Sequence, residues 1–180
     1  MQTAAPFFII MKKVYYSDIN FTVVPADFSN PNAQHRVLEE LFGIDENEKV
    51  YSTAVEVYGV KVLYSKPSDY SPSLKSTLPL PSVVRYLIEL QSIKDYNKLI
   101  AEYNKEKGIF ILTLAAGEQL LIANGYKATD FGSVIYFILE ALRQNQINPQ
   151  QTVVNLYAAI GIDELEKLES YVKGVKICAL

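Results

Sequence analysis

Residues 109–124 read I-F-I-L-T-L-A-A-G-E-Q-L-L-I-A-N, and this stretch decides the fold class. Two apolar runs, Ile109–Ala115 and Glu118–Asn124, are separated by Ala116 and Gly117, which predicts a β-hairpin. Gly117 and the later Gly125 flank the second run, and we expect both to be turn glycines. The fold therefore contains at least one antiparallel strand pair.

Helices and strands alternate after the hairpin. Thr129 is the expected cap of a helix whose apolar residues recur every three or four positions and which ends near Asn148. The elements predicted beyond it are a strand at Thr152–Tyr157, a helix at Asp163–Val172 and a strand at Val175–Leu180.

The residues before the hairpin predict a similar mixture. The segment Lys98–Asn104 fits a helical repeat and equally fits a strand, so both readings stay open. Asn30 and Pro31 indicate the start of a helix that Gly43 closes. The other predicted elements are strands at Ile19–Pro25, Lys49–Val57 and Val60–Ser65 and a helix at Ser82–Leu90.

One stretch is typical of a linker. Lys66–Pro81 is rich in proline and serine, which favours a boundary between two parts of the chain. We expect a first lobe at residues 1–78 and a second at 79–180. Both halves place strands before a capped helix and another strand after it, which hints at a duplication.

The composition excludes several classes of protein and site. Of 180 residues, 49% are hydrophobic and 21% charged, and the net charge is -3, so nothing favours a nucleic-acid partner. A single cysteine, Cys178, excludes an intrachain disulfide and a thiolate-rich zinc site. The single histidine, His35, lies on the polar side of its predicted helix, where we expect it to be solvated. No metal site is predicted.

The amino-terminal residues indicate the cellular location of the protein. The apolar residues of Phe7–Lys13 precede two lysines, which is the reverse of a secretory signal, so we expect a cytoplasmic protein. An amphipathic helix packed on the core is the expected structure, and peripheral membrane contact is the alternative.

Several strings resemble a known family. They are residues 118–126 (E-Q-L-L-I-A-N-G-Y), Asp130, Tyr136–Leu139, Tyr171–Lys173 and Thr22–Pro25. Together they resemble an uncharacterised bacterial family of unknown function with the actin-like ATPase fold. The resemblance implies an α/β protein of two ribonuclease-H-like lobes. An intact first lobe would open with a three-strand meander, so the resemblance implies an incomplete first lobe.

The resemblance also implies positions for two nucleotide loops. An Asp-x-Gly turn is expected after the first strand of each lobe, and the matching second-lobe residues are Glu102, Tyr103 and Asn104. A glycine pair is expected in the adenosine loop, where this chain has Ala158 and Ala159 ahead of Gly161. The degenerate nucleotide-loop positions are therefore Glu102, Asn104, Ala158, Ala159 and Gly161, and we expect neither ATP nor magnesium as a cofactor.

These losses predict a function without catalysis, so no catalytic residue is assigned. We expect a scaffold or protein-interaction module, and the alternative is a divergent ATPase that binds nucleotide in the interlobe cleft. No standard phosphate loop of either the Walker or the Rossmann type occurs. A homodimer is expected, because an incomplete first lobe would leave a strand edge exposed to a second chain.

Overall fold

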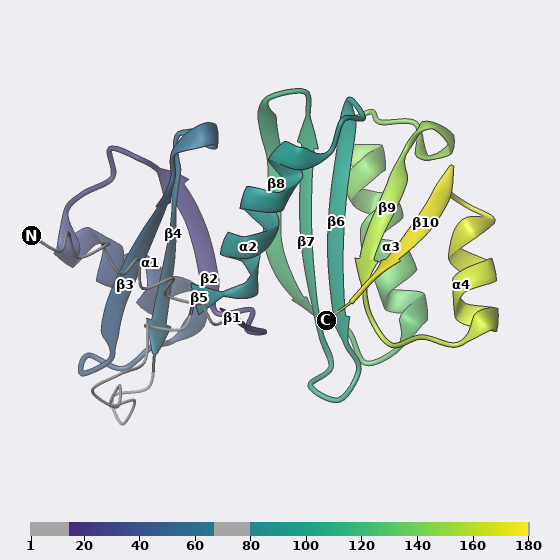
Figure 1. Ribbon diagram of the computed structural model, residues 1–180. Coiled ribbons are helices and arrows are strands. Elements are labelled where there is room, and N and C mark those ends of the chain that lie inside the picture. Colours follow the sequence, from purple (N-terminus) through teal and green to yellow (C-terminus); the bar gives the residue numbers. More distant parts are fainter. Residues whose placement is uncertain (1–14, 67–79, 180) are drawn as a thin grey trace, which may run out of the picture.

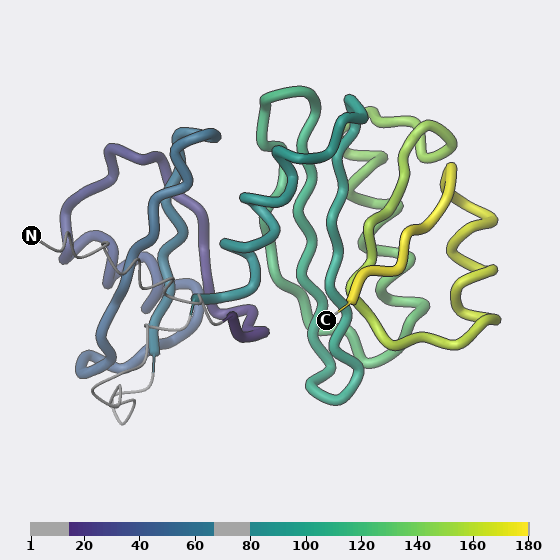
Figure 2. Tube along the Cα trace, in the orientation of Figure 1, coloured from purple at the N-terminus to yellow at the C-terminus, as the bar shows by residue number. Residues whose placement is uncertain are grey.

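The computed structural model describes residues 15–66 and 80–179, which form a mixed α/β protein with two main sheets (Figure 1). The sheets lie side by side, and the described part of the chain that connects them contains a helix (Figure 2). The predicted helix at Phe7–Lys13 and most of the predicted linker lie outside the described residues. None of the helices in the described ranges is long and apolar enough to cross a membrane.

The larger sheet has five strands in the order β10-β9-β6-β7-β8. Strands β6, β7 and β8 form an antiparallel meander, whereas β9 and β10 run parallel to β6. The predicted hairpin is therefore confirmed, and the ambiguous Lys98–Asn104 segment is a strand. The strands are β6 (Asn97–Asn104), β7 (Ile109–Ala116), β8 (Gln119–Lys127), β9 (Val153–Tyr157) and β10 (Gly174–Cys178).

Two helices cover one face of this sheet. Helix α3 spans Phe131–Gln144 and α4 spans Ile162–Glu169. The predicted cap Thr129 is wrong by one residue, because the carboxylate of Asp130 accepts the backbone N–H of Ser133 at 2.9 Å. Both helices also end earlier than predicted.

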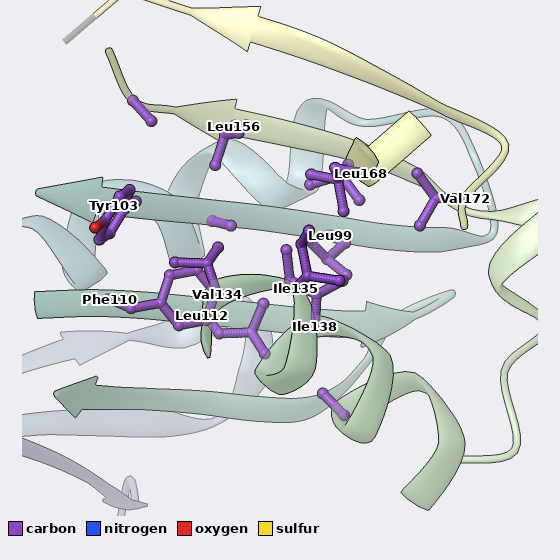
Figure 3. Close-up of a cluster of buried hydrophobic side chains, with 14 of the residues drawn as sticks. Leu99, Tyr103, Phe110, Leu112, Val134, Ile135, Ile138, Leu156, Leu168 and Val172 are labelled. Atoms are coloured by element: carbon purple, nitrogen blue, oxygen red, sulfur yellow. The ribbon is translucent and has the colours of Figure 1, made fainter. Parts of the chain in front are cut away.

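The core between this face and the helices is made of aliphatic and aromatic side chains (Figure 3). Alternate residues of β6 and β7 point into it, and Ile100 and Ile111 between them are buried on the opposite face. Burial on both faces is why these strands are rich in consecutive apolar residues. Its fully buried members include Leu99, Leu112, Leu114, Val134, Ile138, Leu142, Val154, Leu156 and Leu168.

The smaller sheet has three antiparallel strands in the order β2-β4-β3. The strands are β2 (Phe21–Pro25), β3 (Lys49–Val55) and β4 (Val60–Lys66). Helix α1, Pro31–Phe42, packs on one face, starting at its Asn30 cap and ending at Gly43 with φ 65° as predicted. Strand β3 is two residues shorter than predicted, because a 3-10 turn, Glu56–Tyr58, begins the connection to β4.

Helix α2, Ser82–Glu89, joins the two sheets into one core. Its buried residues pack with Phe21 and Val62 of the smaller sheet and with Ile100 and Ile111 of the larger one. Figure 1 shows α2 on the face of the larger sheet opposite α3 and α4. The remaining short elements are the parallel pair β1 (Tyr15–Tyr16) and β5 (Leu80–Pro81) and the 3-10 turns Leu90–Ser92 and Pro149–Gln151.

Candidate functional site

The predicted site residues lie at the carboxyl ends of two adjacent parallel strands in the larger sheet. Strands β6 and β9 are parallel, and Glu102 is the register partner of Tyr157. The carboxyl ends of the two strands therefore meet, which brings Glu102 and Asn104 of β6 near Ala158 and Ala159, the residues that follow β9. Ligands of open α/β sheets bind at this kind of edge.

The predicted residues divide between the two faces of the sheet. Glu102 faces α2, as does Ile100 two residues earlier in β6. Tyr103 and Ala158 face α3 and α4 instead, within the core of that side. The structure therefore places Glu102 and Ala158 on opposite faces of the sheet.

Glu102 is a buried carboxylate with two internal hydrogen-bond donors. Its side chain is 2% exposed, and the hydroxyl of Tyr86 on α2 donates to Oε2 at 2.8 Å. The hydroxyl of Ser17 donates to Oε1. Burial raises the pKa of Tyr86 far above its usual value, and the charge and hydrogen bond of Glu102 raise it further. Both carboxylate oxygens are thus engaged within the protein.

The β6–β7 turn fixes the segment that carries Ser17. Lys107 in this turn donates from Nζ to the carbonyl of Ser17 at 3.1 Å. Asn104 stabilises the same turn, because its Oδ1 accepts the backbone N–H of Lys107 at 3.0 Å. The side chain of Asn104 therefore has a structural partner at the position where the family pattern expects a glycine.

A second polar cluster lies beside Glu102 on the same face. Arg85 and Glu89 on α2 form an ion pair with a 2.7 Å N–O distance, and the hydroxyl of Tyr157 donates to Glu89 at 2.6 Å. The guanidinium of Arg85 lies 4.8 Å from the centre of the Tyr157 ring. Burial raises the pKa of Tyr157, and its hydrogen bond to Glu89 adds to that rise.

This cluster was not among the predicted site residues. Arg85 and Glu89 have the i,i+4 spacing of a helical ion pair, which is a signal that the sequence contains. Tyr157, by contrast, lies 68 residues from Glu89 in the chain, so only the parallel sheet brings them together.

Two of the residues after β9 have structural roles, one in the core and one at the start of α4. Ala158 is 6% exposed, so its methyl group belongs to the core, while Ala159 is exposed. Gly161 precedes α4, and its N–H donates to Glu164 Oε2 at 3.0 Å. The Nζ of Lys105 lies 3.8 Å from Oε1 of Glu164, and this ion pair connects the β6–β7 turn to α4.

Tyr103 is a further buried polar group at this edge. It is 2% exposed, and its hydroxyl has no hydrogen-bond partner within the described part of the chain. Burial raises its pKa, as do the nearby charges of Glu164 and Asp130. A carboxylate-rich surrounding of this kind favours a neutral phenol.

The structure also places the single histidine, the single cysteine and Gly125. His35 is not fully solvated, because it is half-buried and its Nε2 is enclosed without a hydrogen-bond partner among the described residues. Cys178 is partly exposed, and burial raises the pKa of its thiol. Gly125 is not a turn glycine, since it lies inside β8. In the described ranges, no group of three or more histidine, cysteine, aspartate or glutamate side chains could hold a metal ion.

We predict that Tyr86→Phe lowers the free energy of unfolding by about 2 kcal/mol, because it leaves a buried oxygen of Glu102 without a donor. Chemical denaturation monitored by circular dichroism measures this loss. Tyr136→Phe is the matched control, since Tyr136 is 61% exposed and should change stability by less than about 0.5 kcal/mol. Equal effects of the two substitutions would contradict a structural role for the Tyr86–Glu102 bond.

Comparisons with known proteins agree with this architecture. A solved structure from Bacteroides thetaiotaomicron, described as a protein with actin-like ATPase fold and unknown function, matches with a TM-score of 0.73 and 19% identity. The match covers 92% of this chain and 67% of that chain, and at this identity it establishes the fold alone. No curated protein matches the chain.

The sequence itself matches a family description over residues 12–175, which is most of the chain. The expected family of unknown function and the actin-like ATPase fold are therefore confirmed. The chain belongs to the family described as "Protein of unknown function (DUF3822)" and has the actin-like ATPase fold.

Proposed function

We propose that the protein is a non-catalytic scaffold or protein-interaction module built on an actin-like ATPase fold with degenerate nucleotide loops. The observation that supports this most directly is the hydrogen bonding of the Glu102 carboxylate. Both of its carboxylate oxygens accept hydrogen bonds from the protein, one from Tyr86 and one from Ser17. Each oxygen keeps a second lone pair, but Glu102 is only 2% exposed, so a magnesium ion or a phosphate-contacting water would have to displace the packing around it.

We further propose two lobes, with the second at residues 79–180. Its meander β6-β7-β8, followed by the parallel strands β9 and β10, has the strand order of a complete ribonuclease-H-like lobe. Residues 1–78 would form an incomplete first lobe. Helix α2 packs against residues of both sheets, and these apolar contacts support a rigid connection between the lobes rather than a nucleotide cleft that opens and closes.

The residues after β9 support the same proposal. An adenine base needs a close approach to backbone, which glycine permits and a methyl group impedes. The methyl group of Ala158 lies in the core, so the methyl group that would impede such an approach is that of the exposed Ala159, and Gly161 donates its N–H to Glu164. The backbone donor at the start of α4 is therefore already used.

One observation favours the alternative, a divergent nucleotide-binding protein. The hydroxyl of Tyr103 is buried at the same sheet edge without a partner among the described residues, and a buried orphan donor is uncommon. A ligand that reached this edge from the side of α3 and α4 would supply the missing acceptor.

Titration of the protein with Mg-ATP by isothermal calorimetry tests the choice. We expect no binding heat at millimolar nucleotide, with native protein confirmed by circular dichroism in the same buffer. Saturable binding in the micromolar range would overturn the non-catalytic proposal. Tyr103→Phe then serves as the diagnostic variant, because loss of that binding would locate the nucleotide at the β6–β9 edge.

We also propose a cytoplasmic location and a protein partner, without nucleic acid. The net charge of -3 means that the chain has no overall basic excess to attract a phosphate backbone. An interaction function needs a surface that can pair with another chain, and the outer strands of the two sheets, which have one unpaired edge within the described residues, are such surfaces.

A further inference from the structure

A short surface segment connects the two sheets. Residues 15–20, which we call the strap, run from β1 to the start of β2, and Figure 1 shows β1 between the two sheets. The first five residues of the strap are half-buried and Asn20 is exposed, whereas Phe21, the first residue of β2, is 2% exposed. The strap is therefore a surface segment that is anchored in the core at Phe21.

Among the described residues, two hydrogen bonds and an apolar contact join the strap to the larger sheet. The hydroxyl of Ser17 donates to Oε1 of Glu102, and Nζ of Lys107 donates to the carbonyl of Ser17 at 3.1 Å. Ile19 packs so closely on β8 that a Cβ at Gly125 would lie 2.6 Å from Cβ of Ile19. Because the strap continues into β2, these contacts link the larger sheet to the smaller one.

A local interaction stabilises the turn within the strap. Oδ1 of Asp18 accepts the backbone N–H groups of Ile19 and Asn20, at 2.7 and 3.1 Å. These bonds lie wholly within the strap, so they persist when the strap leaves the larger sheet. A segment that keeps its internal bonds and loses only a few external contacts opens as one unit.

The strap covers Glu102 on one side. The two hydrogen-bond donors of this carboxylate differ, because Tyr86 belongs to α2 and is 2% exposed, whereas Ser17 is half-buried and lies on the strap. Movement of the strap removes Ser17 and lets water reach Oε1, while Tyr86 stays on Oε2. Of the strap residues, only Ile19 belongs to the core that joins α2 to both sheets, so this movement leaves that core in place.

We propose that the strap opens as one unit and controls solvent access to Glu102 while both sheets stay folded. In the closed state Oε1 of Glu102 accepts the Ser17 hydroxyl, and in the open state it contacts water at the carboxyl end of β6. The proposal goes beyond the proposed function, because it assigns a conformational switch that operates without nucleotide and without a partner.

Carbodiimide labelling of carboxylates tests the proposal, because it measures how often a reagent in solution reaches Glu102. The probe is a water-soluble carbodiimide with glycinamide, and peptide mass spectrometry compares Glu102 with Glu118, an exposed carboxylate next to β8. In the wild type we expect Glu102 to be labelled at least about ten-fold more slowly than Glu118. Equal labelling of the two carboxylates would contradict a closed strap.

Two variants loosen the strap without touching Glu102. Lys107→Met removes the donor to the Ser17 carbonyl, and Ile19→Ala removes most of the apolar contact at Gly125. Each should speed the labelling of Glu102 about three- to ten-fold, as expected for the loss of one such contact, and should leave Glu118 unchanged. The two effects should multiply in the double variant, because both contacts resist the same opening.

Leu168→Ala is the control for general destabilisation. Leu168 is fully buried in the core on the opposite face of the larger sheet, so its truncation destabilises the protein without loosening the strap. It should leave the labelling of Glu102 unchanged. If it speeds the labelling as much as the strap variants do, exposure of Glu102 requires unfolding of the protein and the proposal is wrong.

The strap variants can also overturn the proposal. If Lys107→Met or Ile19→Ala is folded by circular dichroism and labels Glu102 at the wild-type rate, the strap does not open as one unit over Glu102. The labelling needs no nucleotide, so the Mg-ATP titration reports separately on the proposed function.

Discussion

Gly125→Val is expected to lower the free energy of unfolding by about 3 kcal/mol, because β8 and the segment before β2 touch at this residue. A Cβ at position 125 would lie 2.6 Å from Cβ and 2.9 Å from Cα of Ile19. The obstacle includes backbone, so it cannot rotate away, and relief requires the two sheets to move apart. Chemical denaturation with circular dichroism measures the loss.

Gly174→Val is the matched control for this prediction. Gly174 lies at the start of β10, where a Cβ would meet nothing within 4 Å, so we expect a change within about 0.5 kcal/mol. A second test pairs Gly125→Ala with Ile19→Gly, which removes the clashing Cβ. The double variant should lose less stability than the sum of the two single variants. Additive losses would show that Gly125 and Ile19 do not contact each other.

Local patterns predicted much of the fold, and their reasons are visible in the structure. The 109–124 hairpin follows from two apolar runs around Gly117, which has φ 58° in the turn. Helix α1 follows from Asn30, whose side chain accepts two backbone N–H groups, and from Gly43 at its end. These features depend on residues a few positions apart, so a single sequence contains them.

Features that depend on distant residues were missed or left open. Lys98–Asn104 fitted two periods, and its pairing with β7 and β9 decided in favour of a strand. Gly125 was predicted to be a turn glycine, whereas its small size accommodates Ile19, which is distant in sequence. The Glu102 network joins Ser17 and Tyr86 across 85 and 16 residues. No local spacing predicts such partners.

The same distinction applies to the candidate site. The family pattern identified the strand ends at Glu102 and Ala158, and the parallel pairing of β6 with β9 brings those ends together. The pattern could not predict that Glu102 and Ala158 lie on opposite faces, nor that Tyr157 binds Glu89. Those relations follow from how α2, α3 and α4 pack against the sheet.

Alkaline pH is expected to destabilise the protein, chiefly through Tyr86. Its phenol keeps its proton in the folded state well above the ordinary value of 10.0, whereas the unfolded chain loses the proton near that value. The unfolded state therefore binds fewer protons above about pH 10, and stability falls with rising pH. One such group lowers the free energy of unfolding by about 1.4 kcal/mol per pH unit above about pH 10, or about 2.7 kcal/mol in total by about pH 12.

The contribution of Tyr86 to the pH dependence of stability can be separated from the contributions of other groups. Tyr157 also makes stability fall with rising pH, since burial and Glu89 raise its pKa. Lys66 has the opposite effect on stability, because burial lowers its pKa. Both groups remain in Tyr86→Phe, so the difference between wild type and this variant isolates Tyr86. Denaturation midpoints measured across the alkaline range should converge as pH rises, because the wild type loses its advantage. If the midpoints of the two proteins fell in parallel with pH, the Tyr86 phenol would ionise in the folded protein as it does in the unfolded chain. The hydrogen bond to Glu102 would then not keep the proton on Tyr86.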